Sequence, residues 1–474
     1  MNNDTVKKGA SSNRQSVNLK KLKSRGLEEI NLNAAGIDIG GGSHYVAIPE
    51  GRDTDSVREF GSFTEDLAKL VSWLKRCKID TVAMESTGVY WMALYEMLEA
   101  AEIEVLLVNA RQIKNVSGRK TDVLDCQWIQ KLHTCGLLQG AFRPEAKICE
   151  LRGYLRQRGM LIKSAATHIQ HMQKALTLMN LQLINVISDI TGGTGMRIIR
   201  AIVAGERDPG VLATYRDSRC KNPAEIIKKS LMGHYKDEQV FSLKQAVELY
   251  DFYQQKITEC DSMIEKHLES FAVKIEGDDP KINGNNGKSN SKKKGQKNSP
   301  SFNVRESLLR ITGVDLTRVP GIEAATALTL ISEIGFDLSK FRSGKAFASW
   351  LGLSPENKIS GGKVLSSKSK RTGSRAATCF RMAAFTLFRS KSSLGAFLRR
   401  LRGRIGAPKA ITAVAHKLAL IVYAMLKHGQ EYVEKGQEYY ESLYQDRVIK
   451  NLKRRAEAFG LTIIEKQGVS SMVG

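Results

Sequence analysis

Short apolar runs alternate with helical patterns between residues 34 and 145. Five of the runs have the length and composition of strands: AAGIDIG, HYVAIPE, VREFGSF, TVAMEST and EVLLVNA. Between them, TEDLAKLVSWLKRC and YWMALYEMLEAA repeat apolar residues at helical spacing, and the first is expected to begin with Thr64 as its N-cap. Strands that alternate with helices after an initial hairpin predict a mixed α/β sheet.

From about residue 147 the apolar residues recur at steps of seven. This spacing predicts two long helices with coiled-coil-like seams, separated by a shorter helical region around MRIIRAIVAG. The seam positions are Leu155, Ile162, Ile169 and Leu176, with Ala165, Met172 and Met179 beside them, and later Leu243, Tyr250, Ile257, Ile264 and Phe271. The pattern fits a helical hairpin within one chain and a seam between two chains, and the two can coexist.

Composition divides the chain further. The stretch EGDDPKINGNNGKSNSKKKGQKNSPSFN has almost no apolar residue and is typical of a disordered linker. After it, LTRVPGIEAATALTLISEIG resembles a helix–hairpin–helix, whose turn amides could hold a DNA phosphate or could serve packing alone. The predicted plan is a flexible basic arm (1–33), an α/β domain (34–145), a helical coiled-coil region (146–275), the linker (276–303), a mainly α C-terminal domain (304–435) and a tail (436–474).

The charge of the chain points to a polyanionic partner. The formal net charge is +24, and residues 340–409 contain 17 lysines and arginines against a single acid, Glu356. A solvated surface would mix the two signs, so this region indicates nucleic acid binding. No apolar run is expected to approach the roughly 20 residues of a membrane span. Seven scattered cysteines without a CxxC pair favour reduced thiols, and His168 and His171 fit a solvated or RNA-facing helix better than a metal site.

The sequence GIDIGGGSHY (36–45) contains the first candidate site. An acid at a strand end beside a glycine turn, here Asp38, suits either a nucleotide phosphate or a metal ion. A nucleotide site of the actin type would require later glycine-rich loops, and the later part of the chain is basic instead. Further carboxylates follow at Glu85, at a strand end, and at Asp122 and Asp125, which share one helix face.

Four such carboxylates can hold two Mg²⁺ ions about 4 Å apart, an arrangement that supports phosphodiester chemistry. Mg²⁺ prefers oxygen ligands and retains water molecules that a substrate can displace. The alternative is structural, with Glu85 and Asp125 only capping helices or pairing with Arg119 and Lys120.

The stretches GIDIG, MESTGVYW and VLLVNARQIKNVSGRKTDVLDCQWI resemble the N-terminal domain of the DEDD transposases of insertion sequence 110 and its 1111 subgroup. The resemblance implies a RuvC-like, RNase H-type fold, with Asp38, Glu85, Asp122 and Asp125 as the acidic tetrad. It continues through LRGYLRQRGMLI and IVAGERDP and resumes after the linker, covering most of residues 34–430. The basic arm and the linker depart from the family pattern and are interpreted as tolerated insertions.

The same resemblance implies a nucleophilic serine in GLSPENKISGGKVLSSKSKRTGSR, where the matching residue is Ser360. Gly361 and Gly362 would let the backbone approach the DNA strand. Dense positive charge would neutralise the phosphate in the transition state, from Lys363, Lys368, Lys370, Arg371 and Arg375. Without the resemblance, Ser366, Ser367 and Ser369 are equal candidates, and the whole stretch could be a basic loop that only binds phosphate.

The resemblance therefore implies a Mg²⁺-dependent recombinase that excises and inserts a mobile element. Its partners would be DNA, a structured noncoding guide RNA and further copies of itself, as a dimer or tetramer, in the nucleoid-associated cytoplasm of a bacterium or archaeon. Two alternatives remain. One is a metal-dependent endonuclease of the Holliday-junction-resolving type, without a covalent intermediate. The other is a non-catalytic nucleic-acid-binding protein.

Overall fold

The computed structural model describes residues 28–86, 88–109, 121–275, 297–370 and 372–463. Most of the predicted basic arm, Arg119, Lys120, Arg371 and most of the predicted linker lie outside these residues. The chain divides into two compact units, Met1–Arg143 and Pro144–Gly474.

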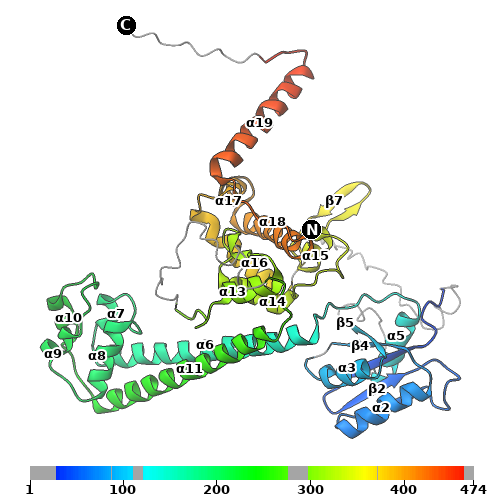
Figure 1. The fold of residues 1–474 in the computed structure, drawn as a ribbon, viewed down its shortest axis with the longest axis horizontal. Helices are drawn as coiled ribbons and strands as arrows, with labels where there is room; N and C mark the ends of the chain where they lie inside the picture. The colour runs from blue at the N-terminus through cyan, green and yellow to red at the C-terminus, as the bar shows by residue number, and fades with distance from the viewer. Residues whose placement is uncertain (1–27, 87, 110–120, 276–296, 371, 464–474) are drawn as a thin grey trace, which may run out of the picture. The chain divides into compact units, whose positions relative to one another are not determined.

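The first unit is built on a five-stranded sheet with the order β3-β2-β1-β4-β5 (Figure 1). Its strands are β1 (Ala34–Ile39), β2 (Ser43–Ala47), β3 (Val57–Gly61), β4 (Thr81–Glu85) and β5 (Glu104–Val108). β1, β2 and β3 pair antiparallel, whereas β1, β4 and β5 pair parallel. The five predicted strands and the mixed sheet are thus confirmed, and the arrangement is consistent with an RNase H-like fold.

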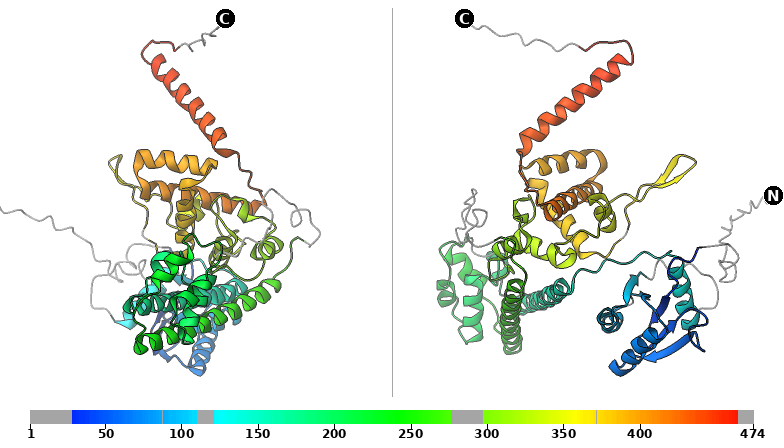
Figure 2. Two further views of the ribbon diagram at one scale, coloured as in Figure 1. Left: turned by 90° about the vertical axis from the view of Figure 1, so that its left-hand side faces the viewer. Right: turned by 45° about the vertical axis from the view of Figure 1, so that its right-hand side comes forward.

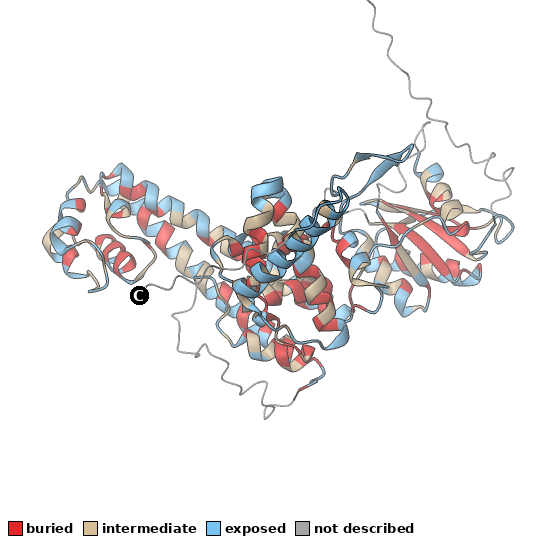
Figure 3. Cartoon of the chain, turned by 90° about the horizontal axis from the view of Figure 1, so that it is seen from above, coloured by how far each residue is buried: buried red, intermediate tan, exposed pale blue. Residues whose placement is uncertain are grey.

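Helices cover both faces of this sheet. Helices α2 (Thr64–Arg76) and α3 (Trp91–Ala100) pack on one face through a core that includes Trp73 and Leu94. Helix α5 (Asp122–Thr134) packs on the other face, where Ile129 contacts the sheet. The central strands are accordingly buried on both sides, as Figure 3 shows.

The predicted N-cap of α2 is wrong by one residue. The cap is Phe63, and Thr64 is the first helical residue. The carbonyl of Phe63 already accepts the first helical hydrogen bond, from the amide of Leu67 at 3.0 Å, so the helix has begun before the threonine side chain could cap it.

The second unit begins with the two long helices that the seven-residue pattern predicts. α6 (Ala146–Leu178) and α11 (Asp237–Glu269) lie antiparallel, side by side (Figure 1). Between their distal ends are α7 (Leu183–Val186), α8 (Gly193–Val203), α9 (Pro209–Thr214) and α10 (Ala224–Ser230). The helical hairpin therefore exists within one chain, while its coiled-coil character stays a prediction.

The C-terminal part of the chain is mainly helical. Its helices are α13 (Val304–Thr312), η1 (Leu316–Arg318), α14 (Ala324–Ile334), α15 (Gly344–Trp350), α16 (Arg375–Thr386), η2 (Leu387–Arg389), α17 (Ser393–Ile405), α18 (Ala407–His428) and α19 (Gly436–Glu457). The two short strands β6 (Lys358–Ser360) and β7 (Lys363–Ser366) form a separate hairpin. Except for α19, these helices share one core with the base of α6 and α11, since Ile148 and Leu268 pack in the same cluster as Leu330 and Val422.

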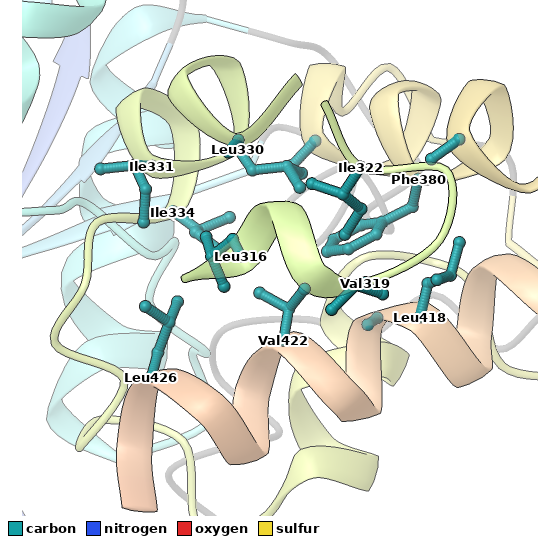
Figure 4. Close-up of a cluster of buried hydrophobic side chains, with 14 of the residues drawn as sticks. Leu316, Val319, Ile322, Leu330, Ile331, Ile334, Phe380, Leu418, Val422 and Leu426 are labelled. Carbon is teal, nitrogen blue, oxygen red and sulfur yellow. The ribbon is translucent and has the colours of Figure 1, made fainter. Parts of the chain in front are cut away.

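The structure differs in part from the predicted helix–hairpin–helix. The expected helix before the Pro-Gly turn is a single 3-10 turn, η1, and the turn is packed against the core through Val319 and Ile322 (Figure 4). Gly321 lies so close to the Ala383 carbonyl that an added Cβ would be 2.6 Å from it. These contacts give the turn a packing role, and its phosphate-binding role stays a prediction.

The expectation that no segment reaches membrane-spanning length is corrected by α18. Among the described residues, this one helix is long and apolar enough to cross a membrane by length and composition. Half of its apolar window is buried inside the protein, and Val414, Leu418 and Val422 belong to the C-terminal core. A core helix passes the same test, so the finding is weak evidence for a membrane.

Candidate active site

Two of the predicted carboxylates lie at the same edge of the sheet. Asp38 is next to last in β1, and Glu85 is the last residue of β4. The two strands are parallel with Ile37 beside Met84, so continuing this register by one residue brings Asp38 beside Glu85. Both side chains are half-buried. The carboxyl ends of adjacent parallel strands thus carry one acid each.

The other two carboxylates are positioned by a close contact between α5 and β1. A Cβ on Gly36 would lie 2.2 Å from the amide nitrogen of Gln130 and 2.4 Å from the carbonyl oxygen of Cys126, far inside van der Waals contact. The helix therefore crosses the strand backbone to backbone, at a point that requires glycine. The first turn of α5, which contains Asp122 and Asp125, follows the capping residue Thr121, whose hydroxyl accepts from the amide of Leu124 at 3.3 Å.

Electrostatic effects on two neighbouring groups show that the acids share one neighbourhood. Burial raises the pKa of the Cys126 thiol to about 12, and the nearby carboxylates of Asp38 and Asp125 add to this. The pKa of Tyr45 is raised first by its hydrogen bond to Glu59, and Asp122 contributes through its charge. Tyr45 is itself the cross-strand partner of Asp38. Asp38, Asp122 and Asp125 are therefore gathered around the end of β1.

The four acids suit a magnesium site by their chemistry, because carboxylate oxygens are the ligands that Mg²⁺ prefers. In the part of the chain that the structure describes, however, no three acidic, histidine or cysteine side chains are close enough together to hold a metal ion. The backbone thus brings the acids to one edge, while their side chains do not converge on one point.

Sequence reasoning missed an aromatic residue at this edge. The ring of Tyr90 lies over the glycine turn that follows β1, 3.5 Å from where a Cβ on Gly41 would be, and 54% of the residue is exposed. It belongs to MESTGVYW, but nothing in the spacing of that stretch indicates a contact with a turn almost 50 residues earlier. Only the folded sheet brings the two together.

Ser360 lies at the tip of the β6–β7 hairpin. Gly361 and Gly362 form the turn with φ angles of 53° and 75°, both in the left-handed region, and Ser360 pairs with Lys363. The hairpin extends away from the helices of its own unit (Figure 2) and is exposed, including the apolar side chain of Val364. This places the serine where a large partner could reach it.

The base of the hairpin is tied down by contacts among the residues that flank it. The amide of Glu356 donates to the Lys368 carbonyl at 3.0 Å, and the Lys370 ammonium lies 3.7 Å from the Glu356 carboxylate. Of the competing serines, Ser366 is half-buried and accepts a weak hydrogen bond from the Lys368 amide, while Ser367 and Ser369 are exposed. Lys363, Lys368, Lys370 and Arg375 are all exposed, so positive charge surrounds every candidate.

Comparison with known protein families gives two matches. A transposase family model named for its DEDD residues and for IS110 matches residues 35–181. A second, described as the transposase IS116/IS110/IS902 family, matches residues 315–399. The first match contains α5, all four acids and the sheet except for Ala34, and the second contains the β6–β7 hairpin with Ser360. A search of curated proteins found no match.

Proposed function

The chain belongs to the IS110 family of transposases, and from this we propose that Asp38, Glu85, Asp122, Asp125 and Ser360 carry out its cleavage and exchange of DNA strands. The observation that carries the proposal is the arrangement at the end of β1. Strand pairing and the Gly36 contact bring acids distant in sequence to one sheet edge. Grouping carboxylates in this way does not stabilise the fold, since their like charges repel one another, and this favours a functional role.

The four acids would hold Mg²⁺, which would stabilise the negative charge that builds up on a phosphate during cleavage. Bound Mg²⁺ would allow the carboxylates to come together, because its positive charge would offset the repulsion between them.

Ser360 would be the nucleophile. Its Oγ would attack a DNA phosphorus, forming a phosphoserine ester and breaking one P–O bond of the strand, while the released sugar hydroxyl takes up a proton in place of the one lost by the serine. In strand exchange the hydroxyl of a different strand would then attack the ester and release the serine. The surrounding lysines would draw in the phosphate and neutralise it.

The recombinase would act on the ends of its mobile element and on a target site, guided by a structured noncoding RNA that the element encodes. Support for the RNA comes from the family resemblance. The positive net charge of the chain supports a polyanionic partner, either DNA or RNA. The seven-residue pattern of α6 and α11 would also serve assembly into a dimer or tetramer.

Variants of the acidic set test the metal proposal. Replacing any one of Asp38, Glu85, Asp122 or Asp125 with its amide should abolish recombination and leave nucleic acid binding largely intact, since the metal site is lost but the basic surface is not. EDTA should have the same effect on the unaltered protein. Asp66→Asn, in α2 of the same unit, is the matched control and should recombine normally. Normal recombination by two of the four variants would refute the metal site.

A further inference from the structure

A pocket of about 260 Å³ lies between α17, α18 and α19. Three tyrosines of α19 line it, at positions 439, 440 and 444, together with Phe397 of α17 and Lys417 of α18. Neither family match includes α18 or α19, since the second ends at residue 399. Most of the pocket thus belongs to a part of the chain that neither match covers.

Helix α19 is held to α17 by its first half. Tyr440 makes an edge contact with Phe397 at 5.9 Å between ring centroids, and Gln437 accepts a hydrogen bond from Arg399 at 2.7 Å. Yet no residue of α19 is buried, and Tyr439 and Tyr444 remain 42% and 40% exposed. The Arg400 guanidinium already lies over the ring of Tyr444, whereas the Lys435 ammonium is 4.7 Å from the ring centroid of Tyr439. Of the two rings, Tyr439 is therefore the less crowded surface for a flat ligand.

The pocket also carries positive charge that the protein does not fully compensate. Lys417, Lys435 and Arg447 line it. The pKa of Lys417 is lowered, first by partial loss of water around its ammonium group and then by the nearby Arg447; Glu434 opposes this only in part. A bound anion would relieve the repulsion between Lys417 and Arg447.

The Glu434 carboxylate is already committed to the local backbone. It accepts hydrogen bonds from the amides of Ser393 and Gly436, both at 2.8 Å, and from the hydroxyl of Tyr432 at 2.6 Å. It therefore holds the α18–α19 connection in place.

We propose that this pocket binds one unpaired nucleotide of a single-stranded nucleic acid, with its base stacked on Tyr439 and its phosphate against Lys417 and Arg447. Aromatic rings beside cations commonly bind single strands, because each base has a flat face that can stack on a ring and each phosphodiester group carries a negative charge. The volume lies slightly below the roughly 300–1,000 Å³ of ordinary ligand pockets. It suits one base and excludes a duplex. The site is independent of the catalytic roles proposed above.

Binding of two labelled ten-residue strands to the full chain tests the proposal. Oligothymidylate and an abasic strand of equal length carry the same backbone charge, so their affinity ratio isolates stacking from the other basic surfaces. Tyr439→Leu should reduce this ratio roughly tenfold, given about 1–3 kcal/mol per stacked base. Tyr439→Phe should preserve it, and Arg447→Gln should weaken both strands alike. Tyr215→Leu, an exposed tyrosine outside the pocket, is the matched control.

Photocrosslinking of the unaltered protein provides a readout that does not depend on how the variants fold. Single strands with 5-iodouracil, as DNA in one arm and RNA in the other, should label the peptide that contains residues 435–447, and the stronger arm identifies the source of the strand. Three results would each overturn the proposal. They are an unchanged affinity ratio in Tyr439→Leu, labelling confined to other peptides, and displacement of the strands by an acidic peptide without any base preference. Ser360→Ala should retain the ratio, so this site and the catalytic proposal can fail separately.

Discussion

At Gly36, the backbone of α5 occupies the space that any larger residue would need for its Cβ. The position of Asp122 and Asp125 relative to Asp38 depends on this contact. Asp38 is two residues from Gly36 in β1, and the two other acids lie within about two helical turns of the contact in α5. A residue without a side chain therefore determines the geometry of charged residues that it does not contact.

Gly36→Ala should destabilise the first unit by about 1–3 kcal/mol and reduce recombination, because the new methyl group forces α5 away from β1. Urea unfolding followed by tryptophan fluorescence reports on this unit, which contains Trp73, Trp91 and Trp128 of the four tryptophans. Gly42→Ala is the matched control, since a Cβ there meets nothing within 4 Å. Equal unfolding midpoints for the two variants would mean that α5 does not depend on Gly36.

Individual acids could be predicted from the sequence because strand ends and the i, i+3 helical spacing are local features. Asp38 and Glu85 follow apolar runs, and Asp122 and Asp125 share a helix face. The roles of Gly36 and Tyr90 could not be predicted, since each depends on a contact with a segment far away in the sequence. The choice of Ser360 over its neighbours still depends on the family resemblance.

Among the helices, α6 and α11 are joined by a buried ion pair. Arg158 and Asp261 are only 6% and 3% exposed, and Nη2 of Arg158 lies 3.3 Å from Oδ2 of Asp261. Asp261 also accepts from the amide of Ser301 at 3.1 Å. The carboxylate thus links both long helices to the segment that leads into α13.

Asp261→Leu should destabilise the second unit by about 3–5 kcal/mol, since it leaves the Arg158 charge buried without a partner. The double variant Arg158→Leu with Asp261→Leu should recover much of that loss. As a control, Asp251→Leu breaks the exposed pair with Arg200, which should cost about 1 kcal/mol or less. Thermal unfolding measures all three, and a double variant no more stable than Asp261→Leu would contradict this role for the pair.

At the level of elements, the regular spacing of apolar residues was sufficient to predict the strands and the two long helices, but not how they pack together. Ala165 and Met172 are buried in the hairpin, whereas Leu155 and Ile162 are only half-buried, although the seven-residue pattern places all four on the seam. The pattern also predicts no element in residues 436–474, where α19 forms. Its apolar residues stand among charges, and their pairing with α17 is visible only in the folded chain.

Across the whole molecule, positive charge is concentrated in the C-terminal part, around the hairpin and α17. Binding of duplex DNA should therefore weaken steeply with salt, with a slope near 0.9 per phosphate neutralised on a plot of log affinity against log salt. Lys368→Glu with Lys370→Glu should flatten that slope by about 1–2 units. Lys228→Glu with Lys229→Glu, in α10, is the control with equal charge change. If the two double variants reduce the slope equally, the hairpin is not the main DNA-binding surface.

The two-site account depends most on Ser360, and a trapped covalent adduct tests it directly. A DNA substrate nicked beside the cleavage site loses its short fragment after cutting, so the phosphoserine ester cannot be reversed and protein stays attached to DNA under denaturing conditions. Mass spectrometry of the adduct peptide should place the DNA on Ser360. Ser360→Ala should lose both adduct and recombination, while Ser367→Ala keeps both. A label on Ser366, Ser367 or Ser369 would contradict the assigned residue, and cleavage without any adduct would instead indicate a metal-dependent nuclease.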